Sequence, residues 1–384
     1  MEVVVADETG LVKELRMGAT NVALRQWGSR PQNRDARGVT GLCWLPGQED
    51  TQVLHTLRDG SGMVYHLTEG RVEMQFSGLL QDAQGVACLP SQEAPRLVCA
   101  NSQGQAAVAV LAGEDPQDVV AHQVAQFQWG THVAAFACRK DGEECLTGGE
   151  NNLLTAWDLA TGKAVWRSKN FKNDFLDLTV PMYDKDVKYF HGCPATFATC
   201  TAFSEVRLYD RREQRRAVGR TKFGEVAFQC LAVSPDDSLL AVGDVTGELT
   251  IFDARSLGHP LRRLKGAGGS IRCVDFHPTQ PVVVSVGLDR FVRLHDVNTA
   301  GKAKTRAYMK QRLCKALFKS TDPSLVSDSA EDAEEGTQEQ EQQDEDARFE
   351  ANFSSIKKLP KNTELRKRRR ELQKAKERKK RSTT

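Results

Sequence analysis

Short alternating and apolar stretches follow one another along the first 320 residues, and their order recurs. Residues 271–276 alternate, residues 282–286 form a continuous apolar run, residues 291–295 alternate again, and residues 305–309 make a fourth stretch. Residues 228–252 repeat the first three stretches. Alternation at every second residue predicts a strand with one buried face, and a continuous apolar run predicts a strand buried on both faces. The pattern therefore predicts units of four short strands.

The third stretch of these units often ends on an apolar-x-apolar-aromatic-Asp sequence. The terminal aspartates are Asp158, Asp210, Asp253 and, after a histidine, Asp296, and the last three are 43 residues apart. Weaker endings lie near residues 14, 66 and 110, which gives seven units at spacings of 43 to 52 residues. This period is typical of WD-type propeller blades. We expect an all-β, seven-bladed WD40-type β-propeller over residues 1–320.

The first unit lacks its innermost strand. Residues 3–6 and 11–15 begin at what should be the second strand of a blade, and residues 312–318 resemble the inner strand at 271–276. We therefore expect blade 1 to be closed by both ends of the propeller, because such pairing removes two open sheet edges.

The charge of the last 64 residues is strongly segregated. Residues 322–350 hold twelve acidic residues and one basic residue, whereas residues 351–384 hold fourteen basic and three acidic residues. We interpret residues 321–350 as an acidic disordered linker and residues 351–384 as a basic tail suited to nuclear import receptors and to RNA phosphates. A solvated spacer and a solubilising tail are the alternatives. The cations of the tail are Lys357, Lys358, Arg366, Lys367, Arg368, Arg369, Arg370, Lys374, Lys376, Arg378, Lys379, Lys380 and Arg381.

Cysteine spacing and hydropathy predict an intracellular protein. The ten cysteines are scattered singly, with no C-x-x-C pair and no zinc-like spacing, so we expect reduced thiols and no metal or cofactor. No stretch is apolar enough for a membrane span, and the amino terminus has no cationic segment typical of a signal peptide.

Residues 167–184 do not fit a blade, because they are too long for a turn between blades. Long loops on rigid scaffolds often carry function, so we predict a partner-binding insert. Its candidate contact residues are Asn170, Lys172, Asn173, Asp174, Asp177, Tyr183 and Asp184. In the alternative interpretation, Phe175, Leu176, Leu178 and Tyr183 only fill a groove on a blade.

The insert reads K-N-x-x-N-D-F-L-D-L-x-V-P-x-Y-D from residue 169 to 184, which resembles the insert of the WD repeat-containing protein 74 family. The resemblance implies a monomeric propeller of the nucleus and nucleolus that assembles the large ribosomal subunit. It also implies binding to pre-ribosomal proteins and rRNA, support of rRNA processing, and release by an AAA-type ATPase. The blades depart from the usual WD pattern, since Ala267 stands where histidine is common.

No catalytic motif is present. Residues 162–163 do not complete a phosphate-binding loop, and there is no H-E-x-x-H sequence, so we expect no enzyme. The alternative function is a substrate receptor of a cullin-type ubiquitin ligase. Residues 209–212 and 252–255 resemble the W-D-x-R ends of such receptors, although each arginine could simply pair with its own aspartate.

Overall fold

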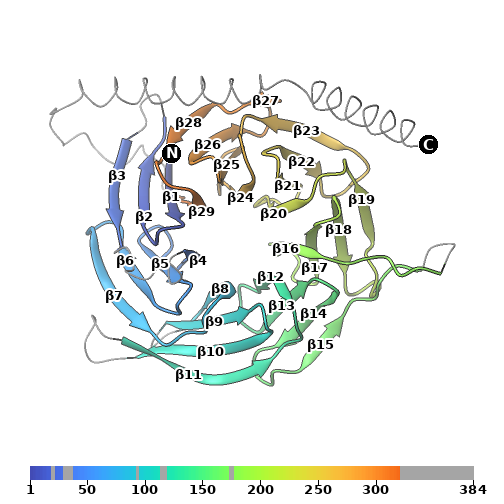
Figure 1. The fold of residues 1–384 in the computed structure, drawn as a ribbon, viewed down its shortest axis with the longest axis horizontal. Helices are drawn as coiled ribbons and strands as arrows, with labels where there is room; N and C mark the ends of the chain where they lie inside the picture. Colours follow the sequence, from blue (N-terminus) through green and yellow to red (C-terminus); the bar gives the residue numbers. More distant parts are fainter. Residues whose placement is uncertain (19–21, 29–37, 92–94, 113–118, 173–176, 321–384) are drawn as a thin grey trace, which may run out of the picture. The chain divides into compact units, whose positions relative to one another are not determined.

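The computed structural model describes residues 1–18, 22–28, 38–91, 95–112, 119–172 and 177–320. Within these ranges every regular element is a β-strand. The strands form sheets arranged in a ring (Figure 1). The predicted all-β propeller is therefore confirmed. The acidic linker and the basic tail lie outside the described residues.

The sheets follow the chain in order around the ring. The first has the order β29-β1-β2-β3, made of β29 (Leu313–Phe318), β1 (Glu2–Asp7), β2 (Val12–Arg16) and β3 (Val22–Trp27). Next come β4 (Val39–Trp44), β5 (Gln52–Leu57), β6 (Gly62–His66) and β7 (Arg71–Ser77). The parallel pairing of β7 with β11 joins these to β8 (Ala83–Leu89), β9 (Arg96–Asn101), β10 (Gln105–Ala112) and β11 (Val119–Gln128).

The later sheets contain β12 (Val133–Cys138), β13 (Glu144–Gly149), β14 (Asn152–Asp158) and β15 (Ala164–Arg167), then β16 (Asp184–Tyr189), β17 (Thr196–Thr201), β18 (Glu205–Asp210) and β19 (Gly219–Lys222). A further sheet holds β20 (Phe228–Val233), β21 (Leu239–Asp244), β22 (Leu249–Asp253), β23 (Pro260–Lys265) and the short β27 (Gly301–Lys302). The last holds β24 (Ile271–Phe276), β25 (Val282–Gly287), β26 (Phe291–Asp296) and β28 (Thr305–Tyr308).

The two ends of the propeller meet in the first sheet. Strand β1 lies between β2 and β29, and Val4 is opposite Leu317 in an antiparallel register. The indole of Trp44 donates a hydrogen bond to the carbonyl of Phe318, 3.2 Å away, which ties β29 to β4. Val3 packs in one core with Phe318 and with residues of the last sheet. The ring therefore depends on contacts between segments that are 300 residues apart in sequence.

Apolar packing and tight turns hold neighbouring sheets together. Strands β5, β13 and β25 are buried along their whole length, as expected for strands covered on both faces. Gly60 lies in the β5–β6 turn with φ 84°, and a Cβ there would lie 2.2 Å from the carbonyl oxygen of Leu79. Asp244 closes the β21–β22 turn by accepting hydrogen bonds from three backbone N–H groups.

Candidate functional site

The insert between β15 and β16 is attached to the sheets on both sides of it. The amide of Lys169 donates to the carbonyl of Arg215, 2.8 Å away, and the guanidinium of Arg216 donates to the carbonyl of Asn170 at 3.0 Å. On the returning limb, the carbonyl of Met182 accepts a hydrogen bond from the amide of Asn151. The two limbs leave the outer part of the ring beside β18 and β19 (Figure 1).

An aromatic residue that the sequence analysis did not select anchors the insert. The ring of Phe171 lies beneath two guanidinium groups, with the Cζ of Arg220 4.4 Å and that of Arg207 5.1 Å from the ring centre. Both arginines bind Glu205, and Arg207 holds it through two bonds of 2.9 and 2.6 Å. Burial alone would raise the pKa of Glu205, but hydrogen bonds from Arg220 and Arg207 bring it below its usual range. The insert therefore rests on a charged cluster of fixed geometry.

Asp184 does not face a partner, so its assignment as a contact residue is wrong. Its side chain is fully buried where β16 begins. Burial raises the pKa of Asp184 to about 6, although the positive charge of Arg207 opposes this rise. The residue sits in the body of the sheet because it opens the inner strand and pairs with Thr201 of β17. The sequence pattern could not separate the end of the insert from the start of this strand.

Two of the other predicted contact residues, Asn170 and Tyr183, are held by contacts within the chain. The amide nitrogen of Asn170 donates to the carbonyl of Val180, 2.8 Å away, so this side chain links the two limbs of the insert. Tyr183 is half-buried, with the ammonium group of Lys185 3.7 Å from its ring centre.

The accessible candidates lie nearer the tip of the insert. Lys172 and Asp177 are exposed, and Asp177 has a φ of 58°. Leu178 is 60% exposed, which argues against the part of the alternative interpretation in which it fills a groove on a blade. Asn173 and Asp174 lie outside the described residues, as do Phe175 and Leu176.

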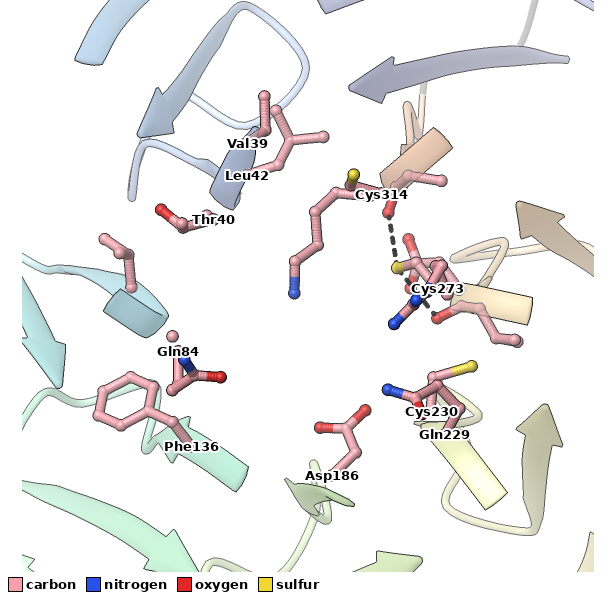
Figure 2. Close-up of a pocket in the computed structure, with 18 of the residues that line it drawn as sticks. Val39, Thr40, Leu42, Gln84, Phe136, Asp186, Gln229, Cys230, Cys273 and Cys314 are labelled. Carbon is pink, nitrogen blue, oxygen red and sulfur yellow. Dashed lines mark hydrogen bonds between the residues drawn. The ribbon is translucent and has the colours of Figure 1, made fainter. Parts of the chain in front are cut away.

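The innermost strands surround a central cavity of about 870 Å³ (Figure 2). Its cationic lining residues are Arg58, Lys185, Lys188, Arg272 and Lys315. Asp186 accepts a hydrogen bond from the amide of Leu231 at 2.9 Å, and Asp275 accepts one from the amide of Phe318 at 3.1 Å. These bonds join β16 to β20 and β24 to β29. The two carboxylates therefore have a structural role at the blade junctions.

The cysteine thiols that line the central cavity are poor nucleophiles. Burial raises the pKa of Cys230 and Cys273, and it raises the pKa of Cys314 to about 11. A protonated thiol reacts slowly, since the thiolate is the reactive form. All ten cysteines of the chain lie in described ranges and are unpaired. In those ranges we find neither a metal-binding cluster of His, Cys, Asp and Glu residues nor a helix with the length and hydropathy of a membrane span.

The ligase-receptor alternative depends on the arginines that follow β18 and β22, in residues 209–212 and 252–255. Arg212 is paired with Asp210 at 2.7 Å, and Arg211 is paired with Glu144 of the neighbouring sheet at 2.6 Å. The side chain of Arg255 is exposed. The arginines in residues 209–212 are thus paired within the chain. For Arg212 this is the pairing with its own aspartate that the sequence analysis gave as the simpler explanation of the motif.

Comparison with known proteins agrees with this architecture. Residues 258–296 match the family model described as WD domain, G-beta repeat. The chain is 30% identical to WD repeat-containing protein 74 of Homo sapiens over 333 residues, which cover 83% of this chain and 81% of that protein. It is 31% identical to the protein of the same name from Mus musculus over 330 residues, with the same coverage.

A second group of relatives matches over a shorter region. Ribosome biogenesis protein nsa1 of Schizosaccharomyces pombe is 28% identical over 179 residues, which cover 41% of this chain and 43% of that protein. Because the first group is matched over most of both chains, the resemblance seen in the insert extends through the propeller. The chain belongs to the WD repeat-containing protein 74 family.

Proposed function

We propose that this protein is a non-enzymatic scaffold for assembly of the large ribosomal subunit, bound to pre-ribosomal particles and supporting rRNA processing. The observation that carries the proposal is the 30% identity to WD repeat-containing protein 74 across 83% of the chain. The match to a protein named for ribosome biogenesis supports the same process. Burial raises the pKa of the cysteine thiols that line the central cavity, so these thiols are protonated and suit binding better than catalysis.

The insert is the proposed contact for a protein of the pre-ribosomal particle. Its base is fixed by Phe171 and by Arg216, whereas Lys172 and Asp177 are exposed. Asn173 and Asp174 extend the same polar segment in the sequence. A rigid base lowers the entropy lost when the tip binds, which favours affinity.

The remaining steps of the proposal concern entry and release. The basic tail would be recognised by nuclear import receptors and would bring the protein to the nucleus and nucleolus, where its cations could also contact rRNA. Release from the particle by an AAA-type ATPase would return a monomeric propeller to the free pool. These steps rest on the tail composition and on the family resemblance.

Sedimentation of the full chain in a sucrose gradient of cell extract tests the scaffold role of the insert. The test variant combines Asp174→Asn with Asp177→Asn, because asparagine removes the charge while tolerating a positive φ. Loss of an interface hot spot costs about 2 kcal/mol or more, so the variant should move from particle fractions to the top of the gradient. The matched control, Glu49→Gln with Glu69→Gln, removes two exposed carboxylates of the second sheet and should stay with the particles. Equal sedimentation of both variants would remove the insert carboxylates from the contact.

A further inference from the structure

Arginine recurs at one position on three successive outer strands. Arg220 of β19, Arg263 of β23 and Arg306 of β28 are 43 residues apart. Each pairs with a residue of the neighbouring strand that lies three places before the aspartate at the end of that strand. All three are exposed. The repeat of the propeller therefore places one of these cations on each of the outer strands β19, β23 and β28, which follow one another around the ring (Figure 1).

Lysines extend the same edge. Lys222 and Lys265 are also 43 residues apart, and the parallel pairing of β23 with β27 places Lys302 directly opposite Lys265. Like charges directly opposite on neighbouring strands destabilise a sheet. A bound polyanion would relieve this repulsion.

The edge carries no acidic residue of its own. Strands β19, β23, β27 and β28 contain neither Asp nor Glu. Their cations are Arg220, Lys222, Arg262, Arg263, Lys265, Lys302 and Arg306. The outer strands β3, β7, β11 and β15 contain only three, Arg25, Arg71 and Arg167, over a greater length, and Glu73 lies among them. The positive charge is thus concentrated on one arc of the ring.

The arginines and lysines of this arc differ in their neutralisation. Glu205 pairs with Arg220, and Glu248 pairs with Arg263, its Oε2 accepting a hydrogen bond from Nη2 at 2.8 Å. Among the described residues, Lys222, Lys265 and Lys302 have no ion pair within 4.0 Å. The uncompensated charge of the arc therefore includes these three lysines.

We propose that the outer edge formed by β19, β23, β27 and β28 binds the sugar-phosphate backbone of RNA. Cations spread over several strands suit a long polyanion, because each phosphate contact releases counterions. The strands offer little for reading bases, since their one aromatic residue, Tyr308, is half-buried with its ring 5.1 Å from that of Phe291. Binding is therefore independent of base sequence. The choice of RNA as the polyanion rests on the proposed function, and the surface itself rests on the charge pattern.

The test measures binding of a 30-base-pair RNA duplex to the full chain across a salt series. Lys222→Glu, Lys265→Glu and Lys302→Glu are combined in one variant. The control combines Arg96→Glu, Lys140→Glu and Lys163→Glu, three exposed cations on other sheets, so both proteins have the same net charge and the same tail. We expect the test variant to bind at least about ten-fold more weakly than the control, with a salt slope lower than wild type by about 3, or one per lysine.

Two results would overturn the proposal. One is an equal affinity and salt slope for the test and control variants, which would assign RNA binding to the tail alone. The other is a loss of binding to poly-L-glutamate, with RNA binding unchanged, which would identify the edge as a surface for acidic proteins. Neither result affects the proposed scaffold role, which would fail separately if the wild-type chain did not sediment with pre-ribosomal particles.

Discussion

Replacing Asp184 with asparagine should stabilise the propeller at neutral pH. The carboxyl group is fully buried at the start of β16, and burial raises its pKa from 3.8 to about 6. At pH 7.5 the carboxyl group of Asp184 is therefore ionised while buried, and the folded state stabilises this charged form less than the neutral form. Asparagine has the same shape and carries no charge. Arg207 keeps its ion pair with Glu205 after the substitution.

The pKa of Asp184 fixes the magnitude and sign of the effect. A carboxyl group with a raised folded-state pKa adds stability below its unfolded-state pKa, and this stability is lost as pH rises through the folded-state pKa. The rise from 3.8 to about 6 corresponds to about 3 kcal/mol between pH 3.8 and pH 7.5, at 1.36 kcal/mol per pH unit. Wild type should lose this stability relative to Asp184→Asn over that window.

Urea unfolding of both proteins at pH 4.5, 6.0 and 7.5 measures this difference. The free energy of unfolding of Asp184→Asn should exceed that of wild type by up to about 3 kcal/mol at pH 7.5 and should approach it at pH 4.5. Glu49→Gln, which changes an exposed carboxyl, should match wild type at each pH. A variant that is less stable than wild type by the same amount at every pH would refute the reasoning, because Asp184 would then act as a hydrogen-bonding group whose charge is immaterial.

Three further perturbations test other parts of the account. Removing residues 351–384 should leave the melting temperature almost unchanged, because the last strand ends at Phe318, while nuclear accumulation measured by fluorescence microscopy should fall; a large drop in melting temperature would show that the tail supports the ring. Removing residues 1–15 takes away β1 and all of β2 except Arg16, so β29 loses its partner and the product should aggregate in size-exclusion chromatography. A cooperative monomer would contradict the role of these strands in closure. Phe171→Ala should speed proteolysis of the insert, because the stacked arginines lose a contact worth about 0.5–2 kcal/mol. Phe171→Leu should speed it less. Equal rates for Phe171→Ala and wild type would mean that the ring does not anchor the insert.

The repeat pattern could be predicted because each blade shows the same short strands in sequence. Residues 271–276, whose alternation predicts an inner strand, form β24 with these bounds. The turn chemistry was harder to predict. In the β21–β22 turn, Asp244 accepts hydrogen bonds from the backbone N–H groups of Thr246 and Gly247, and the strand pattern does not indicate this contact. Local sequence identifies a strand, whereas the turn depends on which carboxylate can reach the amides.

In the insert, the motif identifies the segment but does not predict the role of each residue. Its length and its resemblance to a known family identified the segment, but the role of each residue depends on contacts that are remote in sequence. Phe171 became an anchor because Arg207 and Arg220 lie over its ring, and no periodicity in the chain indicates that contact. Asp184 belongs to the inner strand, although the motif groups it with exposed residues.

Association with large-subunit precursors is the central claim, and one measurement tests it most directly. The full chain is tagged and purified from cells, and the RNA and proteins that accompany it are quantified against an untagged control. The account predicts enrichment of large-subunit rRNA precursors over small-subunit precursors. Recovery of a cullin adaptor without rRNA precursors would contradict it and would support the ligase-receptor alternative.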